Sequence, residues 1–406
     1  MARPRAVELD PGYPEPMSDL ERRALLPAGL RDVLPPDAAF EAAVVEKLIA
    51  CFAAHGYRRV KAPLVEFEEG LLSGAGAAMA SDTFRLMDPV SQRMMGLRAD
   101  ITPQIARIAA TRLKKAPRPL RLSYAGEVLR VKGTQLRPER QFGQVGVELI
   151  GAETPQADAE MVLMAVEALA SIGVPRMSVD LTAPLLVPSL CATFDISAES
   201  RTALMTALDR KDSAAVQNLA GSHANLLLTL LASAGEADTA LAALATMNLP
   251  HGAVVERERL SQVTRLIRAA APDLTLTVDP VENRGFAYHT GVSFTIFAPG
   301  LHGELGSGGR YMAVNGTIES AGPHGEPATG FTLYVDEILR VLPSAENGPC
   351  IFVPMGTPGE VARQLRAQGW TTLSGLGPVD DPVAEARRLD CTHAYLDGRV
   401  VELPPG

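Results

Sequence analysis

The stretch that decides the fold reads LRADITPQ and occupies residues 97–104. Its polar residues interrupt an apolar pattern directly before a helix that the sequence predicts over 102–113. Asp100 or Thr102 can cap that helix, because a side-chain oxygen at a helix start accepts a hydrogen bond from a backbone N–H that has no partner within the helix. Helix capping is the simpler interpretation of this stretch taken alone.

Two strands follow, predicted at 120–129 and 141–150 and separated by a polar, basic loop. Gln144 and Glu148 alternate with apolar residues in the second strand, so both side chains lie on one face. A polar face opposite an apolar one indicates either a polar cleft or a solvent-facing sheet surface. The strand itself does not separate these two interpretations.

A third stretch combines glycines with polar and aromatic residues. It reads NRGFAYHTG at 283–291 and continues as GELGSGGRY at 303–311. Glycines permit close approach of the backbone to a ligand or to another strand. No Lys-Ser or Lys-Thr pair follows them, as a phosphate-binding P-loop requires, and His289 has no accompanying nucleophile motif or metal-binding motif. The sequence therefore predicts no metal site.

The composition is typical of a folded protein. The chain has 406 residues, a length that predicts two or three domains. Of these residues 47% are hydrophobic and 21% charged, which argues against intrinsic disorder. No apolar run reaches the ~20 residues that a membrane helix needs, and the first residues lack the apolar core of a secretory signal. Four cysteines stand far apart in sequence, which disfavours a zinc site or a disulfide scaffold and predicts a cytoplasmic location. The net charge of −9 gives no general attraction to nucleic acid.

Helices and strands are also predicted on both sides of these stretches. Residues 36–54 have the pattern of an amphipathic helix, and 57–65 that of a strand interrupted by Pro63. The Ala- and Leu-rich residues 197–270 predict four or five short helices. Further predicted elements are a hairpin at 83–87 and 93–98, a helix at 155–172, strands at 274–278, 285–297 and 330–334, and an α/β tail with strands at 350–354 and 392–396 and helices at 360–368 and 382–389.

In their order, these stretches resemble the core of class II histidyl-tRNA synthetases. The shared phrases are LRADITPQIAR, QFGQVGVE, NRGFAYHTG, GGRY and GFTLYVDEIL. The resemblance spans residues 25–342 and is closer still to the synthetase-like regulatory subunits of ATP phosphoribosyltransferase. It implies an α+β fold, with a class II synthetase-like antiparallel sheet, flanking helices, an all-α insertion and a small C-terminal α/β unit. The implied domains are a flexible arm (1–25), the core (26–343, with the insertion at 197–270) and a C-terminal domain (350–406).

Two positions depart from the synthetases where those enzymes hold ATP. Their second motif, FRxE, directs an Arg at the α-phosphate, and the matching segment here is YAGE at 124–127, with Ala125 in place of the Arg. Their third motif, GxER, directs an Arg at the γ-phosphate, and Glu337 takes that position here. Phosphoryl and adenylyl chemistry depends on such cations. The resemblance therefore implies a chain that makes no adenylate and uses no cofactor.

The positions that hold histidine in the synthetases are better preserved. By resemblance the ligand-binding residues are Asp100, Gln144, Glu148 and Arg284, together with Tyr288 and His289 of RGFAYH. Carboxylates suit an α-amino group and an imidazole N–H, and an arginine suits a carboxylate. The synthetase pattern is RGLDYY, so Ala287 and His289 replace an Asp and a Tyr. The resemblance implies L-histidine as a ligand, in a pocket of altered chemistry.

These features predict a non-catalytic regulatory subunit that activates a short-form catalytic ATP phosphoribosyltransferase and confers histidine feedback on the first step of L-histidine biosynthesis. The resemblance also implies a homodimer formed through residues 37–66, within a larger hetero-oligomer, and the short tail implies no tRNA partner. The alternatives are a histidyl-tRNA synthetase with atypical motifs, a stand-alone histidine-binding paralogue and a structural dimer with a decayed pocket. Ala125, Glu337 and the short tail argue against the synthetase.

Overall fold

The computed structural model describes residues 25–404, except for 135–136, 284–288, 314–324 and 345–347. The chain divides into two compact units. The larger unit consists mainly of Glu41–Leu342, and the smaller consists of Val33–Phe40 and Pro343–Gly406. Residues 1–24 of the predicted flexible arm lie outside the described range.

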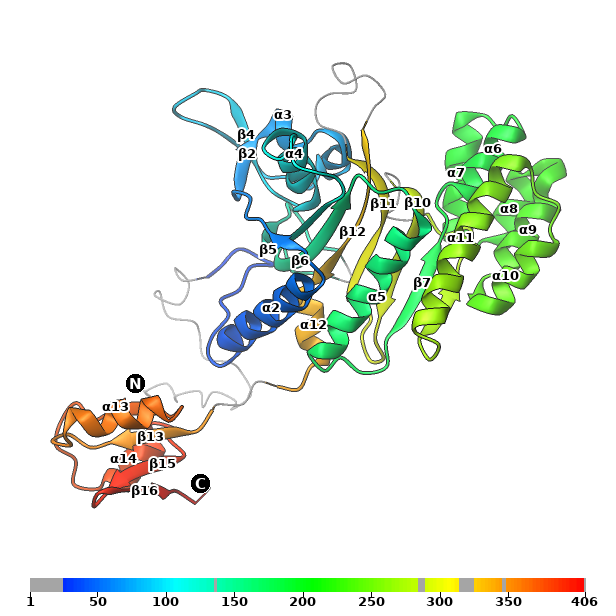
Figure 1. The fold of residues 1–406 in the computed structure, drawn as a ribbon. Helices are drawn as coiled ribbons and strands as arrows, with labels where there is room; N and C mark the ends of the chain where they lie inside the picture. The colour runs from blue at the N-terminus through cyan, green and yellow to red at the C-terminus, as the bar shows by residue number, and fades with distance from the viewer. Residues whose placement is uncertain (1–24, 135–136, 284–288, 314–324, 345–347, 405–406) are drawn as a thin grey trace, which may run out of the picture. The chain divides into compact units, whose positions relative to one another are not determined.

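The larger unit is built on a nine-stranded sheet (Figure 1). Its strands are β1 (Arg58–Arg59), β5 (Leu120–Leu129), β6 (Gln141–Ile150), β7 (Ser178–Thr182), β8 (Gly235–Glu236), β9 (Thr275–Val278), β10 (His289–Phe297), β11 (Gly306–Ala313) and β12 (Glu326–Tyr334). They run in the order β1-β5-β6-β12-β11-β10-β7-β9-β8. Pairing is antiparallel from β5 through to β7, and parallel between β1 and β5 and between β7 and β9. The predicted antiparallel sheet is confirmed in its centre, and β5 and β6 have the predicted bounds.

Strand β11 is rich in glycine, and the sequence pattern does not predict it, because glycine lowers strand propensity. In the sheet, glycine is required because β12 leaves no room for a side chain. A Cβ at Gly308 would lie 2.3 Å from the backbone oxygen of Gly330 and 2.6 Å from the Cβ of Phe331, both in β12. Glycine therefore lets β11 lie close against its neighbour.

A second, three-stranded sheet is formed by residues between β1 and β5 of the main sheet. Its strands are β2 (Val65–Phe67), β3 (Arg85–Met87) and β4 (Met94–Leu97), in the order β2-β4-β3. The predicted hairpin is confirmed in β3 and β4, with Asp88 in the turn accepting hydrogen bonds from the backbone N–H groups of Val90 and Ser91 at 3.1 Å. The interruption predicted at Pro63 within 57–65 is confirmed: β1 and β2 are separate strands, because Pro63 between them cannot donate to a ladder.

Helices cover one face of the main sheet. They include α2 (Asp37–Ala54) and α5 (Pro155–Ser171), and α11 (His251–Ala270) packs against α5 (Figure 1). Helix α2 is fixed to the sheet by Phe52, whose ring meets that of Phe331 edge-on at 5.5 Å. The other helices of this unit are α3 (Glu68–Leu71), α4 (Thr102–Thr111), α6 (Leu186–Thr193), α7 (Ala198–Asp209), α8 (Ser213–Leu219), α9 (Ala224–Ala232), α10 (Ala237–Thr246) and α12 (Val335–Val341), with 3-10 turns at Gly74–Met79 and Gly221–His223. Within the described ranges, no helix is both long and apolar enough to cross a membrane.

The smaller unit is an α/β arrangement with its own core. Its strands are β13 (Cys350–Val353), β14 (Thr371–Ser374), β15 (His393–Leu396) and β16 (Arg399–Glu402), in the order β14-β13-β15-β16, and its helices are α13 (Gly359–Ala367) and α14 (Pro382–Arg388). Phe352, Ala386 and Ala394 are fully buried in this core. The Sγ atoms of Cys350 and Cys391 lie 3.2 Å apart, so two cysteines that are distant in sequence are neighbours.

Candidate functional site

A buried polar layer crosses the main sheet where α4 begins. The Gln144 side chain of β6 donates from Nε2 to Asp100 Oδ2 at 3.1 Å and accepts at Oε1 from the Ile101 N–H at 3.1 Å. Asp100 Oδ1 also accepts from the Thr102 N–H at 2.8 Å, so it ties down the start of the helix as well as contacting Gln144. The helix-start role and the pocket position predicted for Asp100 are therefore compatible.

Glu148 lies at the centre of this layer, with only 1% of its surface exposed. Its Oε1 accepts from Thr102 Oγ1 at 2.8 Å, and its Oε2 accepts from the Tyr311 hydroxyl of β11 at 2.9 Å. Burial raises the pKa of Glu148 to about 8, because it removes the hydration that stabilises the charged carboxylate. Near neutral pH the Glu148 side chain is therefore mainly a carboxylic acid. Because Gln144 and Glu148 are both buried, the interpretation of this strand face as a solvent-facing surface is wrong.

Two further hydroxyls extend the layer. The Tyr124 hydroxyl of β5 lies 3.3 Å from Thr102 Oγ1 and 2.7 Å from Thr332 Oγ1 of β12. Sequence patterns do not predict Tyr124, Thr332 or Tyr311 as site residues, although Tyr124 and Tyr311 belong to the stretches YAGE and GGRY. Strand alternation predicts which residues share a face, but not which residue of another strand lies opposite.

The remaining predicted pocket residues come from one segment. Arg284 and Tyr288 lie outside the described residues. His289 is the first residue of β10 and pairs in register with Tyr311, the residue that contacts Glu148. Burial lowers the pKa of His289 to about 3, so its imidazole is neutral at physiological pH. The described part of the site thus brings Asp100, Gln144 and Glu148 together, whereas His289 lies three strands from β6, next to the strand that carries Tyr311.

The two positions compared with the synthetase ATP site lie in β5, next to Tyr124, and in α12, which follows β12. Ala125 of β5 is opposite Val145, and Glu337 lies in α12 with 1% exposure. Glu337 Oε1 is 3.0 Å from Arg340 Nη1 and 3.7 Å from Arg137 Nε. Burial raises the pKa of the Glu337 carboxyl, and the two arginines oppose that shift.

Arg137, from the loop between β5 and β6, is held by more than Glu337. Its Nε lies 3.4 Å from Asp336 Oδ2, and its guanidinium stacks 3.8 Å from the centre of the Tyr334 ring. Arg137 thus lies beside two carboxylates and an aromatic face, although its buried Nε makes no hydrogen bond to the described residues. The charge of Arg137 is therefore directed at groups of this chain.

The buried carboxyl leads to a prediction for the pH dependence of stability. The pKa of Glu148 rises from 4.5 to about 8 on folding, so the folded state holds an extra proton between these values and the free energy of unfolding falls as the pH rises. Glu148 thus contributes a fall of about 1.4 kcal/mol per pH unit to the free energy of unfolding, and Glu148→Gln removes this contribution. Relative to the wild type, the variant should therefore gain stability steadily from about pH 5 to about pH 8 in urea unfolding.

The matched control is Glu153→Gln, which changes an exposed carboxyl and should leave the pH profile unchanged. Buried His289 acts with the opposite sign between 6.5 and about 3, but both proteins keep it and it cancels in the difference. A difference between Glu148→Gln and the wild type that does not depend on pH would mean that Glu148 is already ionised in the folded chain at neutral pH.

The sheet and its buried polar layer define the class as histidyl-tRNA synthetase-like. The sequence model of the family described as Histidyl-tRNA synthetase matches residues 29–338. A crystal structure from Bacillus halodurans C, described as an ATP phosphoribosyltransferase regulatory subunit/histidyl-tRNA synthetase, has a TM-score of 0.77 at 25% identity, and the match covers 89% of this chain and 96% of that one. The predicted class II synthetase-like fold is confirmed.

Proteins with higher sequence identity to this chain assign it to one family within this class. A protein of Paramagnetospirillum magneticum named ATP phosphoribosyltransferase regulatory subunit is 57% identical over 387 residues, covering 95% of this chain and all (100%) of the relative. A protein of the same name from Rhodospirillum centenum is 56% identical and covers 94% of this chain and 96% of the relative. The chain belongs to the family of ATP phosphoribosyltransferase regulatory subunits.

Proposed function

We propose that this chain is the non-catalytic regulatory subunit of an ATP phosphoribosyltransferase. It assembles with a short-form catalytic subunit and activates it in the first step of L-histidine biosynthesis, in which ATP is joined to phosphoribosyl pyrophosphate. The observation that carries the proposal is the buried Glu337, paired with Arg137 and Arg340; by resemblance this position matches the arginine that synthetases direct at the ATP γ-phosphate. The names of the relatives support the same role.

Electrostatics disfavour ATP at this place. A triphosphate would meet the carboxylates of Asp336 and Glu337 instead of an arginine, and Ala125 supplies no charge at the other clamp position. Arg137 could reach a phosphate only by leaving its ion pairs and the Tyr334 ring. Like charges at contact distance cost several kcal/mol even at an effective dielectric of ~20. The proposed chain therefore forms no adenylate.

The buried polar layer supports L-histidine as the regulatory ligand. Asp100 is only partly buried, so its carboxylate is accessible to an α-amino group, while Gln144 holds it in place at 3.1 Å. Glu148 is 1% exposed and holds Thr102 and Tyr311, so in this proposal histidine reaches it only when one of these hydroxyls moves aside. In this proposal histidine bound here changes the activity of distant catalytic sites, which requires a coupling free energy between the two sites.

The proposal includes a homodimer within the hetero-oligomer. The expected interface lies in residues 37–66, where Leu64 next to Pro63 is 45% exposed in the single chain. A second copy would cover this apolar side chain, and an isologous contact closes a dimer by symmetry.

Reconstitution with a short-form catalytic subunit tests the function. The two purified chains should co-elute in size-exclusion chromatography, the mixture should form phosphoribosyl-ATP faster than the catalytic chain alone, and L-histidine should inhibit it. Asp100→Asn should raise the histidine concentration for half-inhibition about tenfold or more, because a charge-assisted hydrogen bond contributes about 1.5–3 kcal/mol. The complex itself should still form.

The control for this variant is Asp273→Asn, an exposed aspartate with an ordinary environment, which should leave inhibition unchanged. Chains that neither co-elute nor change the catalytic rate would contradict the regulatory role. Saturable ATP binding with adenylate formation from histidine would instead support a synthetase. Assembly without any effect of Asp100→Asn on inhibition would place the regulatory histidine elsewhere.

A further inference from the structure

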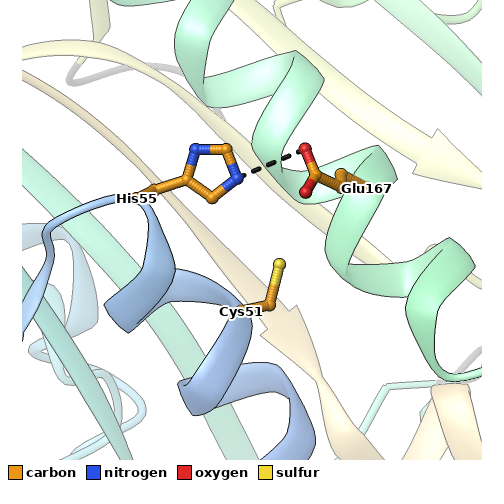
Figure 2. A group of neighbouring side chains, drawn as sticks. All are labelled: Cys51, His55 and Glu167. Atoms are coloured by element: carbon orange, nitrogen blue, oxygen red, sulfur yellow. Dashed lines mark ion pairs between the residues drawn. The ribbon is translucent and has the colours of Figure 1, made fainter.

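Three potential metal ligands converge between α2 and α5, away from the polar layer and from Glu337. They are the Cys51 thiol, the His55 imidazole and the Glu167 carboxylate, and their ligand atoms all lie within 4.8 Å of one another. Figure 2 shows the three side chains directed into a common space between the two helices. Within the described ranges, no other cluster of three or more such ligands occurs.

The backbone explains why the first two ligands meet. Cys51 lies in the last turn of α2, and the His55 N–H still donates to the Cys51 carbonyl oxygen at 3.3 Å just beyond the helix end. Residues four apart in such a turn have neighbouring side chains. Glu167 faces them from α5, with its Oε2 3.2 Å from His55 Nε2. The imidazole nitrogen that would bind a metal is therefore already directed at the carboxylate.

The donor set matches a zinc site. Thiolate sulfur, imidazole nitrogen and carboxylate oxygen are the three protein ligands that Zn²⁺ uses, and a site with three of them leaves one position for water or another small ligand. Tetrahedral zinc holds such atoms roughly 3.3–3.8 Å apart, given Zn–N and Zn–S bonds of about 2.0 and 2.3 Å. Side-chain rotations that shorten the longest separation by about 1 Å would close the site.

The surroundings allow a metal to enter. The Glu167 side chain is 63% exposed and that of His55 32%. Both residues line a cavity of about 590 Å³, which Gln156 and Glu160 of α5 and Leu266 of α11 also border. This space has room for a water molecule or a small anion at the fourth position.

We propose that Cys51, His55 and Glu167 bind one divalent transition-metal ion, with Zn²⁺ preferred, joining the end of α2 to α5. On binding, the Cys51 thiol and the His55 Nε2 release any proton they carry to solvent, so that sulfur binds as thiolate and His55 as an imidazole protonated only at Nδ1, and Glu167 binds through a carboxylate oxygen. No electron is transferred. The simpler interpretation is an ordinary His55–Glu167 ion pair beside an uninvolved thiol, which binds no metal specifically.

A Co²⁺ titration of the full, tag-free and metal-stripped chain tests the proposal. One equivalent should bind and produce the near-ultraviolet absorption of a cobalt–thiolate bond, and Zn²⁺ should displace it. Cys51→Ser should abolish the absorption. Glu167→Gln should weaken binding at least tenfold, and this exposed side chain can be replaced without disturbing the core.

Cys350 and Cys391 supply the matched control, because their thiols form a close pair elsewhere in the described chain. Cys350→Ser with Cys391→Ser should leave the absorption and the affinity unchanged. The melting temperature should rise with Zn²⁺ in the wild type and in this double variant, but not in Cys51→Ser. Any of three results would overturn the proposal: no absorption in the wild type, absorption that persists in Cys51→Ser, or absorption lost in the double variant.

Discussion

Arg310→Met should lower the free energy of unfolding by about 3–5 kcal/mol, because it leaves Asp158 as an unpaired buried carboxylate. The two side chains are only 3% and 4% exposed, and Arg310 Nη2 lies 2.8 Å from Asp158 Oδ1. Arg310 also donates to the backbone oxygens of Ala152 and Thr154 at 2.8 and 3.1 Å. One side chain thus fixes the start of α5 to β11. Urea unfolding of the variant and the wild type measures the loss.

An exposed ion pair provides the comparison. Arg59 and Glu46 lie 2.8 Å apart, but their side chains are 45% and 64% exposed, so Arg59→Met should cost less than about 1 kcal/mol. Combining Arg310→Met with Asp158→Leu should recover most of the lost stability, because no unpaired charge remains. If Arg310→Met costs no more than Arg59→Met, the buried pair does not hold α5 on the sheet.

Gly330→Ala should destabilise the chain by about 3 kcal/mol or more, at the upper end of overpacking effects. A Cβ at this position of β12 would lie 2.0 Å from Glu148 Oε2 and 2.4 Å from the backbone oxygen of Val147. Glu148 could rotate away only by leaving Thr102 and Tyr311, and a backbone oxygen cannot rotate at all. The variant should therefore also lose the proposed histidine binding, which calorimetric titration measures.

Gly377→Ala is the control, because a Cβ there meets no atom within 4 Å. It should change the free energy of unfolding by no more than about 0.5 kcal/mol. Near-wild-type stability of Gly330→Ala would contradict the argument, since it would mean that β6 and β12 separate easily. Normal stability with lost histidine binding would confine the effect of this glycine to the pocket.

Much of the central architecture follows from the sequence alone. Local patterns predict β5 and β6 with their observed bounds. A ten-residue strand with clear turns on both sides can be identified from its own residues, without knowledge of its neighbours. The resemblance correctly predicts the class of fold and the family. The choice of Asp100, Gln144 and Glu148 as one group also comes from the sequence, and the structure brings these three together.

Other features are decided only by the tertiary structure. A strand pattern of period two says that Gln144 and Glu148 share a face, but whether that face is buried depends on the strands and helices that cover it. Burial, not the residue type, makes Glu148 a neutral acid. Likewise, Glu167 lies 112 positions after His55 in the sequence, and only the packing of α5 beside α2 makes them neighbours. Local sequence patterns report periodicity within an element, whereas contacts between distant elements depend on the whole sheet being assembled.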